Sequence, residues 1–129
     1  MKPKILIIED VTEIREGTAE LLRLDGYDVA TAENGTNGLA LVSIFLPDLV
    51  ICDIKMSGID GYEVLAELKS NPLTAEISFL FCTAQSEKKD IRKAMDWGVD
   101  TYLIKPFSEN ELLSAVNACI SKKRKWKYC

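Results

Sequence analysis

Short apolar runs alternate with helical segments along the whole chain, and this alternation constrains the fold more than any other feature of the sequence. Three runs are continuously apolar, as expected for strands covered on both faces. They are 5–8, 49–52 and 77–82. Two further runs, 27–32 and 101–104, alternate more or are shorter, which favours the edges of a sheet. Helical segments that end at glycine or proline signals lie between the runs, at 12–25, 35–45, 61–70 and 86–97.

A final helix is predicted after the last strand. Residues 108–111 have the sequence of a capping box, and Phe107 can pack against Leu112 across the helix start. Strict alternation of strands and helices implies a parallel sheet with right-handed crossovers and helices on both faces. The predicted fold class is therefore α/β, a single doubly wound sheet of five parallel strands.

Length and charge limit the domain organisation. The 129 residues suit one domain with one core, and we expect it to cover 1–121. Five of the 16 basic residues fall in 122–129, which we expect to be a basic tail. The remainder is acidic, which argues against nucleic-acid binding by this domain. No apolar run is long enough to cross a bilayer and no signal peptide is evident, so we expect a cytoplasmic protein without membrane contact.

Cysteine and histidine content excludes several kinds of chemistry. The four cysteines show no CxxC pairing, and Cys52 and Cys82 are expected to be reduced core residues. The chain contains no histidine, which excludes Ser-His and Cys-His nucleophiles and histidine metal sites. Any phosphohistidine must therefore belong to a partner.

Polar residues follow four of the predicted strands, at the edge where an open parallel sheet binds ligands. They are Glu9, Asp10, Asp53, Thr83 and Lys105. Carboxylates about 5 Å apart repel by roughly 3 kcal/mol per pair at an effective dielectric near 20, so a cation must compensate them. Mg²⁺ prefers such oxygen ligands, and an acidic site that also contains a lysine suits a phosphoryl group.

Each of these residues also has a structural alternative. Asp10 with Glu13 could cap a helix, and Thr83 could cap the following one. Asp53 could open a turn, and Lys105 could be a solvated strand end. A cis peptide bond between Lys105 and Pro106 suits so tight a turn.

Four motifs from Lys4 to about Ser121 resemble the receiver domain of two-component response regulators, of the chemotaxis-regulator type. They are "ILIIEDV", "DLVICDIKMSGIDG", "FLFCTA" and "GVDTYLIKPF", in the order and spacing of that family. The resemblance implies a flavodoxin-like (βα)5 fold with strand order 2-1-3-4-5. It also implies a phosphoprotein that is not an enzyme, except in catalysing its own aspartate phosphorylation and slow dephosphorylation.

The resemblance assigns a role to each site residue. Asp53 is implied to accept a phosphoryl group from a sensor histidine kinase or a histidine phosphotransfer protein. Mg²⁺ or Mn²⁺ is implied to bind Asp10, Asp53 and the carbonyl of Lys55, with Glu9 acting through water. The phosphoryl oxygens are implied to contact Thr83 and Lys105. The switch is implied to consist of Thr83 and Tyr102, which change the surface formed by 86–97, 101–104 and the last helix, a surface that also offers a homodimer contact. Tyr102 could instead simply pack at the edge strand.

Some positions depart from the family pattern. Ser57 stands where the family usually has proline, so the loop after Asp53 loses stiffness. Lys55 and Gln85 occupy positions that tune the lifetime of the phosphoryl group in the family, and we hypothesise that Lys55 covers the acyl phosphate. The segment 86–97 has few apolar anchors beyond Ile91, Met95 and Trp97, which is typical of an element that can shift.

Two other functional classes compete with this interpretation. A Mg²⁺-dependent phosphohydrolase of the haloacid dehalogenase kind shares the aspartate chemistry, but it needs a second aspartate at the position of Lys55. A flavodoxin-like cofactor binder needs glycines in the first loop, where the sequence is "EDVTEI". A receiver-shaped module that is never phosphorylated is a further alternative.

Overall fold

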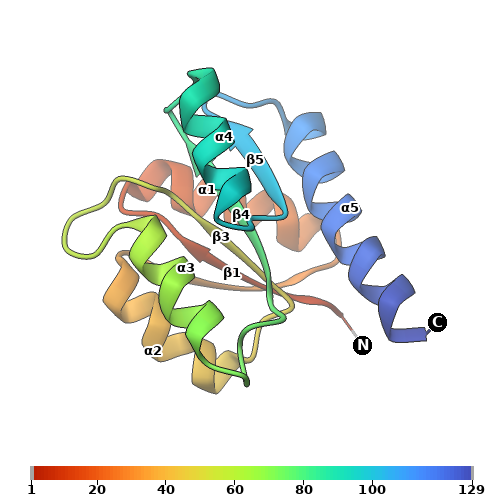
Figure 1. Ribbon diagram of the computed structural model, residues 1–129. Coiled ribbons are helices and arrows are strands. Elements are labelled where there is room, and N and C mark those ends of the chain that lie inside the picture. Colours follow the sequence, from red (N-terminus) through yellow and green to blue (C-terminus); the bar gives the residue numbers. More distant parts are fainter. Residues whose placement is uncertain (1, 129) are drawn as a thin grey trace.

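Five parallel strands form one sheet in the order β2-β1-β3-β4-β5, which confirms the predicted fold class. The computed structural model describes the backbone of residues 2–128 and the side chains of residues 2–122. In chain order the elements are β1 (Lys4–Ile8), α1 (Thr12–Leu24), β2 (Asp28–Ala32), α2 (Gly35–Phe45), β3 (Leu49–Cys52), α3 (Gly61–Ser70), β4 (Ser78–Thr83), α4 (Lys88–Asp96), β5 (Thr101–Ile104) and α5 (Glu109–Tyr128). Figure 1 shows their arrangement in space.

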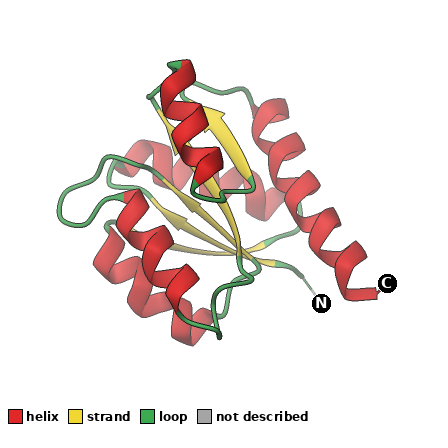
Figure 2. Cartoon of the chain, viewed as in Figure 1, coloured by secondary structure: helices red, strands yellow, loops and turns green. Residues whose placement is uncertain are grey.

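Helices cover both faces of the sheet (Figure 2), and the sheet separates the core into two parts. Helices α1 and α5 pack against one face, where Ile7, Ile51 and Leu80 are buried. Helices α2, α3 and α4 pack against the other, where Ile8 and Phe81 are buried. Successive strand residues alternate between the two parts, because side chains of a strand point to opposite faces. The central strands are therefore apolar throughout.

The last helix begins as the sequence predicts. Ser108 Oγ accepts a hydrogen bond of 3.1 Å from Glu111 N–H, and Glu111 Oε1 accepts one of 3.0 Å from Ser108 N–H. The helix continues to Tyr128, so the backbone of the basic segment 122–128 extends α5 without a break. The division into a domain of 1–121 and a tail stays a prediction. The side chains that make the tail basic beyond Lys122, and Cys129, lie outside the described residues.

Helix α4 is anchored differently from the prediction. Its buried residue is Ala94, and Val99 follows it into the core. Met95 and Trp97, predicted as anchors, are each 46% exposed, and Ile91 is only partly buried. The helix is highly charged, so most of its surface stays in water while one small side chain fits against the sheet.

Two further predictions concern cysteines and membranes. Cys52 and Cys82 are buried and unpaired, as predicted, and so is Cys119. Within the described part of the chain, none of the helices combines the length and the apolar character that a membrane span requires.

Candidate functional site

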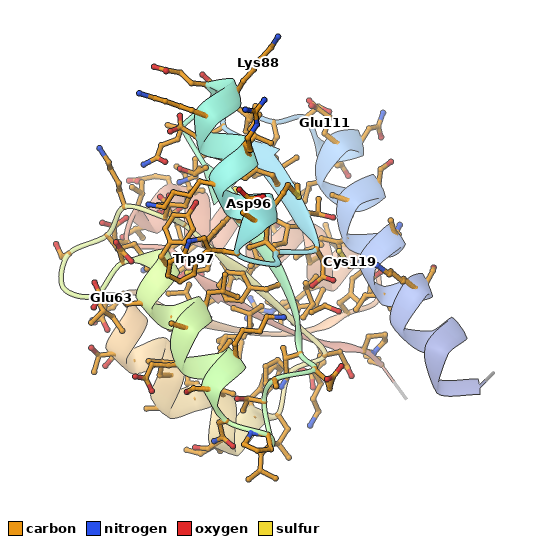
Figure 3. All side chains as sticks on the ribbon, in the orientation of Figure 1. Glu63, Lys88, Asp96, Trp97, Glu111 and Cys119 are labelled. Carbon is orange, nitrogen blue, oxygen red and sulfur yellow. The ribbon has the colours of Figure 1, made fainter. Side chains whose placement is uncertain are left out.

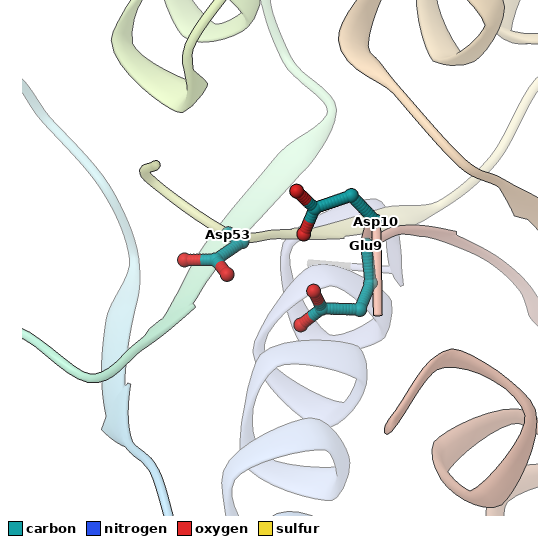
Figure 4. A group of neighbouring side chains, drawn as sticks. All are labelled: Glu9, Asp10 and Asp53. Carbon is teal, nitrogen blue, oxygen red and sulfur yellow. The ribbon is translucent and has the colours of Figure 1, made fainter. Parts of the chain in front are cut away.

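Three carboxylates meet at the carboxyl ends of β1 and β3. The strands pair in parallel register with Ile8 opposite Cys52, so the next residues, Glu9 and Asp53, leave the sheet side by side. One oxygen from each of Glu9, Asp10 and Asp53 lies within 4.8 Å of the others (Figure 4). At such separations the carboxylates repel one another, and a cation can compensate that repulsion. Three hard oxygen ligands at such distances fit a divalent cation such as Mg²⁺.

Asp53 is buried to the extent that its side chain is only 11% exposed. Its Oδ1 accepts a hydrogen bond of 2.7 Å from Ile54 N–H, and its Oδ2 accepts one of 2.8 Å from Lys105 Nζ. The carboxylate is therefore held by one backbone donor and one cation.

Glu9 is almost fully buried and shares the same cation. Its Oε1 accepts a hydrogen bond from Lys105 Nζ, and its Oε2 accepts one of 3.2 Å from Val11 N–H. Burial raises the pKa of Glu9, while the bond from Lys105 opposes that shift. Binding of a metal by Glu9 through water stays a prediction.

Lys105 is the electrostatic centre of the site. Burial lowers its pKa, but the hydrogen bonds to Asp53 and Glu9 outweigh burial, so that the pKa is raised overall and the ammonium stays charged. Its backbone is fixed by a hydrogen bond of 2.9 Å from Lys105 N–H to the carbonyl of Thr83. The peptide bond to Pro106 is cis, the conformation that suits so tight a turn. Lys105 is thus not a solvated strand end.

Asp10 has a different environment from the other two acids. It is exposed, and within the described residues its carboxylate has no hydrogen-bond or ion-pair partner. It does not cap α1, because the N-cap is Val11 and no side chain caps the first turn. The capping alternative for Asp10 and Glu13 is therefore wrong. Asp10 offers the most accessible oxygens of the cluster.

Thr83 and Tyr102 meet through the backbone of one residue. Thr83 Oγ1 accepts a hydrogen bond of 3.3 Å from Gln85 N–H, and the Tyr102 hydroxyl donates one of 2.7 Å to the Gln85 carbonyl. Thr83 does not cap α4, whose N-cap is Glu87. Tyr102 is partly buried, and burial raises its pKa to about 12. Its ring packs against the core below α4 rather than only along the edge strand.

The loop after Asp53 is held by side chains instead of a proline. Met56 and Ile59 pack against the core formed with α2 and α3. Gly58 adopts φ +80°, which favours glycine. Lys55 is exposed, and its role as a carbonyl ligand stays a prediction.

Sequence reasoning missed two residues that shape the site. Arg15 donates a hydrogen bond of 2.9 Å from Nη1 to the carbonyl of Glu9 and so fixes the backbone of the acidic pair. Gly61 packs so closely that a Cβ atom there would lie 2.4 Å from the Asp53 carbonyl oxygen. The spacing of Arg15 from Glu9 carries no recognisable signal. The Asp60-Gly61 pair is typical of a helix start, which hides the close packing of Gly61. Asp60 does form a capping box with Glu63.

Comparisons with known proteins agree with this geometry. Residues 5–117 match the sequence model described as the Response regulator receiver domain. The chain is 37% identical over 120 residues to the DNA-binding dual master transcriptional regulator RpaA of Synechocystis, covering 93% of this chain and 50% of that protein. It is 36% identical over 122 residues to the transcriptional regulatory protein PdtaR of Mycobacterium tuberculosis, covering 94% of this chain and 58% of that protein. The chain thus spans about half the length of the curated relatives that it matches.

A solved structure extends the likeness to three dimensions. The crystal structure of a response regulator receiver domain protein from Clostridium thermocellum superposes with a TM-score of 0.87 at 32% identity, covering 96% of this chain and 98% of that one. The strand order, the acidic cluster with its lysine and the matched family sequence are therefore consistent with one another. The chain belongs to the response regulator receiver domain family of two-component signal transduction.

Proposed function

We propose that this chain receives a phosphoryl group on Asp53 and relays that event as a change of surface. The observation that carries the proposal is the position of Asp53 in the acidic cluster, within hydrogen-bond distance of Lys105. A carboxylate oxygen attacks the phosphorus of a partner's phosphohistidine. The phosphorus–nitrogen bond breaks, the imidazole nitrogen leaves with the electron pair, and an acyl phosphate forms on Asp53.

The neighbouring residues of this chain have distinct roles in the proposal. Mg²⁺ or Mn²⁺, held by Asp10, Asp53 and the Lys55 carbonyl with Glu9 through water, would neutralise charge on the transferred group. The Lys105 ammonium binds a phosphoryl oxygen, as positioned cations do at developing negative charge. Thr83 donates its hydroxyl to another oxygen. In this scheme the chain catalyses only its own modification and its slow reversal.

The switch follows from what the phosphoryl group adds. In the structure the Thr83 hydroxyl accepts a hydrogen bond of 3.3 Å from Gln85 N–H. New charge and acceptor oxygens at Asp53 would attract this hydroxyl. Movement of Thr83 leaves space for Tyr102, which is tied to the same Gln85 backbone. The surface of α4, β5 and α5 then changes, and we propose that it is also the homodimer contact.

The partner is proposed from the chemistry of the chain itself. Because these 129 residues contain no histidine, the phosphoryl donor lies outside them, on a sensor histidine kinase or a histidine phosphotransfer protein. RpaA is described as DNA-binding, a description that applies to a protein about twice as long as the matched segment. We assign no nucleic-acid contact to the acidic body of this chain, and a cytoplasmic location follows from the proposed partners.

Mass spectrometry after incubation with Mg²⁺ and acetyl phosphate tests the proposal. We expect one added phosphoryl group in the natural chain, loss of it in Asp53→Asn, and retention in the matched control Asp28→Asn, which changes an exposed acid at the far end of β2. A phosphoryl group that persists in Asp53→Asn, or none in the natural chain, contradicts the proposal. Steady hydrolysis of a generic phosphate ester would support the phosphohydrolase instead.

A further inference from the structure

Helix α4 has few attachments to the rest of the molecule. Ala94 is its buried residue, while Met95 and the C-cap residue Trp97 are each 46% exposed. An element with so little buried surface takes its position from a small number of contacts, and those contacts decide how it moves. The contacts at its C-terminal end are therefore informative.

The ring of Tyr62 on α3 contacts one side chain of α4 and the side chain of its C-cap residue. Lys93 Nζ lies 4.4 Å from the Tyr62 ring centroid, and the Trp97 ring centroid lies 4.9 Å away with an interplanar angle of 65°. Residues four positions apart share one face of a helix, so Lys93 and Trp97 approach the same ring together. Figure 3 shows Trp97 at the end of α4 that lies beside α3. We call Tyr62, Lys93 and Trp97 the aromatic clamp.

The clamp is joined directly to the loop of the acceptor aspartate. Gly61, the residue before Tyr62, donates a hydrogen bond of 2.7 Å to the carbonyl of Ile54, the residue after Asp53. The absence of a side chain on Gly61 lets the first turn of α3 pack against the Asp53 carbonyl, since a Cβ atom would lie 2.4 Å from it. The start of α3 is therefore in direct contact with the backbone of the Asp53 loop.

The clamp is also joined to the sheet. The Tyr62 and Phe81 rings pack edge-on with centroids 4.9 Å apart, and the Phe81 and Tyr102 centroids are 6.5 Å apart. Tyr62 is buried, with 8% of its surface exposed, so its ring has little room to adjust independently. It thus lies between the Asp53 loop and the end of α4.

We propose that Tyr62 is a coupling residue that transmits a change at the Asp53 loop to the C-terminal turn of α4 through Lys93 and Trp97. This inference rests on the proposed function, because it concerns how phosphorylation of Asp53 reaches the surface. It adds a route through α3 to the one through Thr83 and Tyr102. Trp97 is half-exposed at the end of that route, so its fluorescence can report a change there.

Tryptophan fluorescence tests the coupling. The variant Trp126→Phe leaves Trp97 as the single tryptophan, since the chain has two. Titration with beryllium fluoride and Mg²⁺, which mimic a phosphoryl group on a carboxylate, is expected to change the Trp97 emission. In the same single-tryptophan variant, Tyr62→Leu should reduce the change in Trp97 emission at least about twofold. This is the lower end of the coupling changes that follow replacement of a connecting residue. Tyr62→Phe, which keeps the ring, should retain the response.

A second measurement avoids any direct effect of residue 62 on the fluorophore. Amide hydrogen exchange in α4 should change on phosphorylation in the natural chain, and this change should be diminished in both Tyr62→Leu and Lys93→Gln. Lys93 is exposed, so its replacement keeps the test available if Tyr62→Leu does not fold. Undiminished responses in these variants, or a natural chain whose α4 and Trp97 do not respond, overturn the inference.

Failure of the inference and failure of the proposed function have different signatures. Mass spectrometry of the same samples after acetyl phosphate reports whether Asp53 carries a phosphoryl group. No phosphoryl group in the natural chain contradicts the proposed function. Full phosphorylation of natural and Tyr62→Leu chains with identical α4 responses contradicts the coupling alone.

Discussion

Lys105 Nζ lies 2.8 Å from Asp53 Oδ2 and donates a second hydrogen bond to Glu9, so that one ammonium holds two carboxylates from different strands. The alternation of strand side chains explains this choice of partners. The residue just before each of these two acids faces α2 and α3. Because side chains alternate along a strand, Glu9 and Asp53 face the side of α1 and α5. Leu103 faces that same side, and Lys105, two residues later, shares its orientation. Among the described residues Asp10 contributes an oxygen to the cluster but forms no ion pair with Lys105.

Removal of the ammonium should destabilise the fold in a pH-dependent manner. We expect Lys105→Met to lower the free energy of unfolding by about 3 kcal/mol near pH 8, because two buried carboxylates lose their counterion. Burial already raises the pKa of Glu9, and Lys105→Met removes the hydrogen bond and the positive charge of Lys105 that oppose this shift. A raised pKa in the folded state gives stability that is present at low pH and lost as pH rises through it, so the deficit should shrink toward pH 5.

Urea unfolding at several pH values measures this deficit. The exposed Lys88→Met, which removes a lysine at the start of α4, is the matched control and should have a small effect at all pH values. An equal deficit at pH 5 and pH 8 would show that Lys105 contributes packing rather than charge compensation.

Divalent cations should stabilise the natural chain by binding its acidic cluster. At a hundred times its dissociation constant, Mg²⁺ is expected to add about 2.7 kcal/mol to the free energy of unfolding. Asp10→Asn should reduce this gain, because Asp10 offers the most accessible carboxylate oxygens of the cluster. Thermal unfolding with Mg²⁺ and with a chelator checks the expectation. Equal gains in both proteins would exclude Asp10 as a ligand.

Two glycines in helices should respond to alanine in opposite directions. At Gly61 a Cβ atom would lie 2.4 Å from the Asp53 carbonyl oxygen. That oxygen belongs to the backbone, so it cannot move aside as the end of a flexible side chain could. We expect Gly61→Ala to cost about 1–3 kcal/mol, as overpacking does, and to slow phosphorylation of Asp53. At Gly17, in α1, a Cβ atom meets nothing within 4 Å. Gly17→Ala should therefore stabilise the chain by about 0.5–1 kcal/mol through helix propensity. Chemical unfolding of the pair decides the matter, and a stabilised Gly61→Ala would refute the close packing.

Alkaline titration should distinguish Tyr102 from an ordinary tyrosine. Burial raises the Tyr102 pKa to about 12 from the usual 10.0, so the unfolded chain releases this proton at lower pH than the folded chain. The contribution of the neutral hydroxyl to stability should be complete below pH 10 and lost as pH rises toward 12. Tyr102→Phe should lose less stability than the natural chain over that interval. Phenolate absorbance, compared between the two proteins, reports the ionisation directly.

The buried thiols should be unreactive in the folded chain. Burial raises the pKa of Cys82 to about 12, and it raises the pKa of Cys52 and Cys119 as well. Because the thiolate is the nucleophile, a thiol reagent at pH 8 should modify these three residues only after unfolding. The variant Cys129→Ser restricts the assay to them. Rapid labelling of the native variant would indicate that the core opens readily.

Much of the fold and of the candidate site could be predicted from the sequence. Apolar runs such as 49–52 and the turn signals between them determined which segments are strands and helices, because local periodicity and breaker residues report local structure. Parallel alternation then places every strand exit at one edge, so Glu9, Asp53 and Lys105 were predicted to meet.

Only the tertiary structure decided which of these groups touch one another. Lys105 lies 96 residues from Glu9, and its choice of Glu9 and Asp53 over Asp10 depends on register and on the face that each side chain takes. The burial of Ala94 in place of Met95, and the approach of Trp97 to Tyr62, likewise depend on how α4 lies on its neighbours. Sequence periodicity describes one element at a time, whereas these contacts arise where separate elements pack, and packing selects among faces that local patterns leave equivalent.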